Sequence, residues 1–296
     1  MTAVIKYKIP KSHKLKLLLF VKEKNMEKIK PILNGVQETM LQSFYARVLY
    51  SKRKNHKFYD AKAIETVNRL DYDFSNAKKD SLMNSGVIAR TIVFDELVRS
   101  FIDENPDCTI VNIACGLDTR VYRMDNGKIV WYNLDLPEII AVRDQIYNEK
   151  GRISTIGCSV LNSDWTKQVK KSTKMLFIAE GLSMYLTAEE NAKMLEIIRN
   201  NFDNAVVMLE CLAKKWVNKE KIERSIEKTG AKYVFGADCF EDLGNIAQGY
   251  KKIKDDDITR GMTAIFPILK PLAWLMPVRK AIEKILIFEK ATESAK

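Results

Sequence analysis

The sequence predicts an α/β fold with a doubly wound, mostly parallel, seven-stranded sheet, and two observations support this. From Cys108 onward, short β-branched runs alternate with helical windows about as long as one crossover helix, as in parallel sheets covered on both faces. Two of the runs, 109–114 and 175–180, are almost continuously apolar, which is typical of central strands. We therefore expect the centre of the sheet near these two runs.

The other elements of the sheet region follow from the same alternation. Further strands are expected at 129–134, 153–158, 205–211 and 284–289. Helices are expected between them at 117–123, 137–149, 163–171 and 187–201.

The segment before the sheet is helical by its apolar spacing. It is helix-rich over 26–54, forms a short helix over 59–70 with Asp60 as its cap, loops at Asn84, Ser85 and Gly86, and is helical again over 87–103. One domain is predicted, with an N-terminal helical cap (1–105), a sheet core (106–211 and 250–296) and a helical insertion or lid (212–249).

Composition narrows the class of protein. With 46% hydrophobic and 29% charged residues in 296, the chain can bury a sizeable core. The net charge of +11 is concentrated in residues 1–60, which hold fourteen Lys and Arg against four Asp and Glu. Such a segment can attract nucleic acid, anionic lipid or an acidic substrate, although most are solvated helix faces. Both histidines, His13 and His56, lie there and are interpreted as surface residues.

The cysteines and apolar stretches indicate a cytoplasmic protein. Five cysteines without a Cys-x-x-Cys pair predict neither a disulfide framework nor a zinc site. No signal peptide is recognisable, and the apolar stretch 265–278 is interrupted by three prolines and Lys270, so it is too short to span a bilayer. We expect that stretch to form a lid or an interface patch.

The segment 111–120 and the residues at the ends of the following strands indicate a nucleoside site. A strand followed by a tight turn at Gly116 brings backbone close to a ligand, and Asp135 ends the next strand about 20 residues on, where an acid suits ribose hydroxyls. By spacing alone, this is equally a dinucleotide site, or Asp135 caps the helix starting at Pro137. Because the turn lacks the other glycines of a pyrophosphate loop, we favour S-adenosylmethionine, which has no phosphate.

Several motifs together resemble the leucine carboxyl methyltransferase family, and within it the small-molecule branch of polyketide carboxyl methyltransferases. They are YARV at 45–48, FYDAKA at 58–63, IART at 88–91, VNIACGLDTR at 111–120, NLDLP at 133–137 and AEGLSMYL at 179–186. The resemblance covers most of residues 40–211 and implies the class I fold of methyltransferases that use S-adenosylmethionine.

The resemblance also implies a role for each cofactor residue. Arg90 would hold the carboxylate of the cofactor, Glu180 would seat its methionyl end, and Asp135 would bind its ribose. The turn of Ala114, Cys115 and Gly116 would pass its methionine part, and Ser159 and Val160 would flank the adenine. Family members often have glycine at the position of Ala114 and aspartate at that of Ser159, which indicates either weaker cofactor binding or an adenine contact made by backbone.

The expected activity is O-methylation of a carboxylate or hydroxyl of a small molecule. An ionised carboxylate needs no general base, so no catalytic residue is assigned. For a hydroxyl acceptor, the candidate base is Tyr185, Lys62 or a residue of the insertion, and Arg47, Lys62 and Tyr185 are candidate acceptor contacts.

Four alternatives to a small-molecule methyltransferase remain at this point. The acceptor could be a protein C-terminus or a modified tRNA nucleoside, the chain could be a non-catalytic binding protein that retains the fold, or it could be a nicotinamide dehydrogenase. A metal is not expected, nor is a nucleic-acid partner.

Overall fold

The computed structural model describes residues 28–31, 39–219, 232–275 and 282–291, and its centre is a seven-stranded sheet. The strand order is β3-β2-β1-β4-β5-β7-β6, with β1 to β5 parallel and β7 antiparallel to both neighbours. The strands are β1 (Thr109–Ile113), β2 (Val130–Asp135), β3 (Ile153–Gly157), β4 (Met175–Ala179), β5 (Ala205–Cys211), β6 (Tyr250–Asp257) and β7 (Lys284–Lys290). The expected fold class is confirmed, and β1 and β4 are adjacent at the centre.

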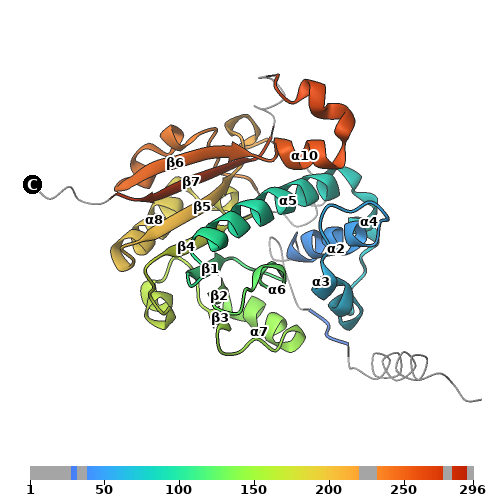
Figure 1. Cartoon of the computed structure of the whole chain (residues 1–296), viewed down its shortest axis with the longest axis horizontal. Helices are drawn as coiled ribbons and strands as arrows, with labels where there is room; N and C mark the ends of the chain where they lie inside the picture. The colour runs from blue at the N-terminus through green and yellow to red at the C-terminus, as the bar shows by residue number, and fades with distance from the viewer. Residues whose placement is uncertain (1–27, 32–38, 220–231, 276–281, 292–296) are drawn as a thin grey trace, which may run out of the picture.

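Two helices cover opposite faces of the sheet (Figure 1). On one face, α5 (Ser81–Glu104) packs Val93 and Val98 into the cluster that contains Ile110 of β1. On the other face, α8 (Ala188–Asn201) packs against the cluster that contains Val111 and Phe177. Because neighbouring residues of a strand point to opposite faces, the continuous apolar runs of β1 and β4 fill both clusters.

The N-terminal helices gather beside the first half of α5 (Figure 1). They are α2 (Thr39–Ser51), α3 (Ala61–Thr66), α4 (Ser75–Lys79) and the 3₁₀ turn η2 (Val67–Arg69). Leu41 and Phe44 of α2 are fully buried in a cluster that includes Leu117, just after β1. The helix cap predicted at Asp60 is confirmed, since its carboxylate accepts from Ala63 N at 3.0 Å. The cap helices are thereby held against the carboxyl edge of the sheet.

Short elements complete the connections. They are α6 (Val121–Met124), η3 (Ser163–Gln168), η4 (Ser183–Tyr185), η5 (Lys214–Trp216), η6 (Phe240–Ala247), α7 (Pro137–Ile146), α10 (Thr259–Ile265) and η7 (Pro267–Leu272). The helix expected at 117–123 therefore starts later, after an irregular turn, and that at 163–171 is 3₁₀. Within 26–54, where helix was expected, the described helix begins at Thr39, and Ile29 forms an isolated parallel bridge to Leu70 instead. In the described part of the insertion, 212–219 and 232–249, the helices are the 3₁₀ segments η5 and η6. Residues 32–38 and 220–231 lie outside the described residues, as does His13.

Two expectations about regular elements were wrong or incomplete. The loop expected at 84–86 is helix, because α5 begins at Ser81, with Asp80 accepting from Met83 N at 3.1 Å. Gly86 is tolerated there although a helical glycine costs about 1 kcal/mol relative to alanine. The strand β6 was not located, because YKKIKDDD has few apolar residues. It is an edge strand paired only with β7, and lysines on an edge discourage pairing with other chains.

The apolar stretch expected to form a lid or patch is largely solvent-exposed from Phe266 onward, whereas Ile265 packs against the core. Ile268 and Trp274 are 84% and 75% exposed, and residues 276–281 lie outside the described part. None of the described helices is long and apolar enough to cross a bilayer. The five cysteines, all within the described residues, are free thiols, as expected.

Candidate active site

A cavity of about 300 Å³ lies at the carboxyl edge of the sheet, where the ends of β1, β2, β3 and β4 meet α2. It lies at the point where the strand order reverses, since β2 and β4 flank β1 on opposite sides. All the residues singled out from the sequence as cofactor contacts line it: Arg90, Ala114, Cys115, Gly116, Asp135, Ser159, Val160 and Glu180. The residues chosen from the sequence as cofactor contacts therefore lie together around one cavity.

The turn after β1 is tightly wound. Ala114 and Gly116 both have positive φ angles, +51° and +47°, and a Cβ on Gly116 would lie 3.0 Å from the Met40 Cβ. The buried guanidinium of Arg143, on α7, donates to the carbonyls of Gly116 and Asp118 at 2.9 Å. Position 116 favours glycine for two reasons: its backbone is in the left-handed region, and α2 approaches too closely to leave room for a Cβ.

Replacing Ala114 by glycine should stabilise the protein. A non-glycine residue in the left-handed region costs about 1–2 kcal/mol, of which the extra chain entropy of glycine offsets about half. We expect Ala114→Gly to raise the free energy of unfolding by about 1 kcal/mol, measured by urea denaturation. Gly116→Ala in the same turn should lower it by at least as much. A less stable Ala114→Gly protein would contradict a strained turn.

The carboxylate of Asp135 joins the ends of β1 and β2. Its Oδ2 accepts from Gly116 N at 2.8 Å and its Oδ1 from Leu136 N at 2.7 Å. Burial raises the pKa of this carboxyl, although the two backbone donors oppose the shift. The alternative role as a helix cap is not what the structure shows, because the N-cap of α7 is Leu136, without a side-chain cap. Each oxygen retains a lone pair for a ligand hydroxyl.

Arg90 is a largely buried arginine of α5. Its side chain is 13% exposed, and its Nε donates to Glu180 Oε1 at 2.9 Å. Its Nη1 lies 3.1 Å from Oε1 of Glu210, at the end of β5. Burial alone lowers the pKa of Arg90, but the carboxylates of Glu210 and Glu180 outweigh it and raise the pKa well above its ordinary value. The guanidinium is therefore a permanent cation at the cavity wall.

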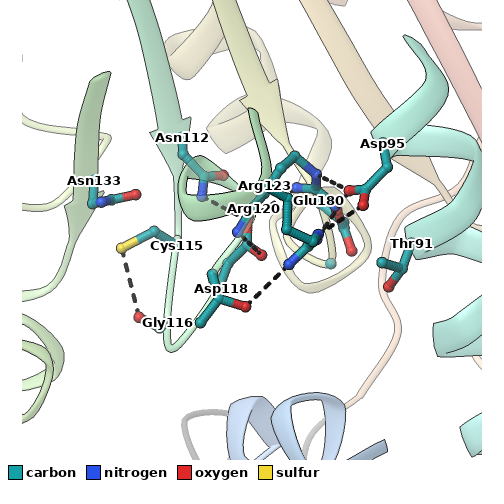
Figure 2. Close-up of polar contacts among 12 residues, drawn as sticks. Thr91, Asp95, Asn112, Cys115, Gly116, Asp118, Arg120, Arg123, Asn133 and Glu180 are labelled. Atoms are coloured by element: carbon teal, nitrogen blue, oxygen red, sulfur yellow. Dashed lines mark hydrogen bonds and ion pairs between the residues drawn. The ribbon is translucent and has the colours of Figure 1, made fainter. Parts of the chain in front are cut away.

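Arg120 forms the centre of a buried network beside this wall (Figure 2). Its guanidinium contacts Asp95 at 2.8 Å, Asp118 at 3.0 Å and Oε2 of Glu180 at 2.6 Å. Glu180 is therefore shared between Arg90 and Arg120. Burial raises the pKa of Asp118, but the nearby arginines, Arg120 above all, hold it well below its usual range. Sequence reasoning quoted Arg120 in a motif but assigned it no role.

The three candidate acceptor contacts are placed differently. Arg47 lines the cavity, yet its guanidinium is held by Asp60 at 3.1 Å and by the carbonyl of Leu117 at 3.0 Å. Tyr185 also lines the cavity. Lys62 does not: it lies on α3, pairs with Glu65 at 2.9 Å and sits over the Tyr122 ring. The structure thus brings Arg47 and Tyr185 to the site and leaves Lys62 outside it.

Two observations complete the geometry. Among the described residues, no group of three or more His, Cys, Asp and Glu side chains could hold a metal ion. Glu210 is a site-associated residue that sequence reasoning missed. The available signal was a single acid in the otherwise apolar strand AVVMLEC, where a buried charge needs a partner.

Comparison with known proteins gives consistent matches. Residues 33–199 match the family model described as leucine carboxyl methyltransferase. A tetracenomycin polyketide synthesis O-methyltransferase of Streptomyces glaucescens is 32% identical over 205 residues, 69% of this chain and 76% of that protein. An S-adenosyl-L-methionine-dependent methyltransferase of Gibberella zeae is 29% identical over 199 residues, 62% of this chain and 66% of that protein.

A solved structure shares the fold. A candidate methyltransferase from Thermobifida fusca superposes with a TM-score of 0.53 at 11% identity, covering 83% of this chain and 94% of that one. At this identity the likeness concerns the fold alone, and it agrees with the class expected from the sequence.

Proposed function

Because the chain belongs to the leucine carboxyl methyltransferase family, we propose that it transfers the methyl group of S-adenosylmethionine to an oxygen of a small-molecule acceptor. The observation that supports this most is the convergence of Gly116, Asp135 and Glu180 on one cavity, with Asp135 bonded to Gly116 N. The curated relatives described above are named as methyltransferases, and one of them for polyketide synthesis.

The residues that line the cavity match the methionyl group, the ribose and the adenine of the cofactor in turn. Arg90 and Glu180 place opposite charges at one end, which suits the carboxylate and ammonium of a methionyl group. Asp135 suits the ribose hydroxyls. Ile139, Val160 and Leu161 line the cavity as apolar side chains, as a purine requires. Ser159 lines it too and offers a hydroxyl that both donates and accepts.

The chain's own contribution to transfer is alignment and exclusion of water. When bound, the cofactor supplies an activated methyl group on a sulfonium leaving group. The side chains at the strand ends fix its orientation, and holding an acceptor at near-attack distance contributes several kcal/mol. A carboxylate acceptor is ionised at neutral pH, so no base is needed. For a hydroxyl acceptor, Tyr185 is at the cavity and Lys62 is not, so Tyr185 is the better candidate base.

The decisive experiment is calorimetry of the whole chain with S-adenosylmethionine and S-adenosylhomocysteine, followed by methyl transfer to a panel of acceptors. We expect binding of both nucleosides and transfer to aromatic polyketide acids or phenols. Transfer to a leucine-terminated peptide or to tRNA would shift the acceptor to the alternative class. Binding without turnover on any acceptor would support a non-catalytic protein.

A further inference from the structure

Glu210 is a buried carboxyl beside the cavity that no contact with ligand explains. Glu210 is the second-last residue of β5 and is 0% exposed. It is not among the residues that line the cavity. It also lies beyond residues 33–199, the part of the chain that the family model matches. Burying a carboxyl is costly unless it is paired, so its partners indicate its role.

Both oxygens of Glu210 are used to join two segments of the site. Oε1 lies 3.1 Å from Arg90 Nη1 of α5, and Oε2 accepts from Gly181 N, in the turn after β4, at 2.5 Å. Gly181 has φ +70°, and a Cβ there would approach the terminal nitrogens of Arg90 at 3.7 and 3.8 Å. The guanidinium and the turn are therefore packed together, with Glu210 behind them.

We propose that Glu210 is a positioning residue for the cofactor, which holds Arg90 and the Gly181 turn in the orientation that receives the methionyl carboxylate. This inference rests on the proposed function. Arginine has several rotatable bonds, and fixing it before the ligand arrives removes an ordering cost from binding. Glu180 contacts only Nε of Arg90, since its second oxygen is bonded to Arg120 at 2.6 Å, and Glu210 is the partner that holds Nη1.

The charges around Glu210 agree with a supporting role. Arg90 from α5, Glu180 after β4 and Glu283 before β7 all face it. Burial raises the pKa of Glu210 well above its ordinary value, Arg90 opposes the shift, and Glu283 and Glu180 add to it. Arg90 thus faces several carboxyl groups, and two of them, Glu180 and Glu210, hold its guanidinium by hydrogen bonds.

Two ligands separate positioning from general damage to the site. S-adenosylhomocysteine carries the methionyl carboxylate, whereas 5′-methylthioadenosine lacks the whole amino-acid end and keeps the adenosine. For Glu210→Gln we expect Kd for S-adenosylhomocysteine to rise about tenfold, because the amide has one accepting oxygen for the two donors, Arg90 Nη1 and Gly181 N, and one hydrogen bond is lost. Kd for 5′-methylthioadenosine should stay within about twofold. The control is Glu241→Gln, the same change at an exposed carboxylate paired with Lys252, which should change neither Kd.

The possible outcomes are distinct. Selective weakening of S-adenosylhomocysteine by Glu210→Gln, with Arg90→Lys showing the same selectivity, supports the proposal. Equal weakening of both ligands, or no change in either, overturns it, whatever the melting temperature of the variant. If the unmodified protein binds neither ligand, the proposed function fails first, and this inference fails with it.

Discussion

Asp135→Ala should raise Kd for S-adenosylmethionine about 100-fold. Each hydrogen bond from a ribose hydroxyl to an ionised carboxylate contributes about 1.5 kcal/mol or more, and two such bonds correspond to about two decades in affinity. The substitution also leaves Gly116 N and Leu136 N without their present acceptor, which loosens the turn beneath the cofactor. Isothermal titration calorimetry with S-adenosylmethionine measures the loss.

A matched control separates binding from folding in this experiment. Asp144 is an exposed aspartate on α7 that accepts from the Thr155 hydroxyl, and Asp144→Ala should leave Kd unchanged. Thermal unfolding of both variants shows whether the sheet edge survives. A folded Asp135→Ala protein that still binds the cofactor at the original affinity would remove Asp135 from the site.

The fold was predictable because its signals are local and repeated. Strands β1 and β4 are buried throughout and almost continuously apolar, which indicated both that they are strands and that they are central. The strand β6 was not predicted because it is buried only at its two ends and its sequence, YKKIKDDD, has few apolar residues. The expected start of α5 was too late because Asn84, Ser85 and Gly86 favour loops locally. In the structure the Asp80 cap and the packing of the helix outweigh that preference.

The cavity was predictable for a different reason. Residues that follow parallel strands necessarily meet at one edge, so Gly116, Asp135, Ser159 and Glu180 converge once the strand assignments are right. Side-chain partners across the fold carry no such signal. Nothing in the sequence links Arg90 to Glu210, which lie 120 residues apart, or shows that Lys62 pairs with Glu65 on α3, outside the cavity.

Loss of Arg120 should destabilise the protein more than any surface change. Its side chain is 1% exposed and contacts three carboxylates, Asp95, Asp118 and Glu180. Removing one partner of a buried ion pair leaves an uncompensated charge and typically costs about 3–5 kcal/mol. We expect Arg120→Met to lower the free energy of unfolding by that amount in urea denaturation at pH 7.

The comparison variant is Arg152→Met, since Arg152 makes a similar pair with Asp125 at the surface. An exposed pair contributes at most about 1 kcal/mol, so this variant should stay close to the unmodified protein.

Arg120 is the largest of the charges that depress the pKa of Asp118 in the folded state. The stability from this interaction is present above the ordinary carboxyl pKa and is lost as the pH falls and Asp118 is protonated. Lowering the pH should therefore reduce the difference between Arg120→Met and the unmodified protein. A difference that is small at pH 7 would contradict the prediction and show that the neighbouring arginines, such as Arg90 and Arg123, are sufficient for these carboxylates.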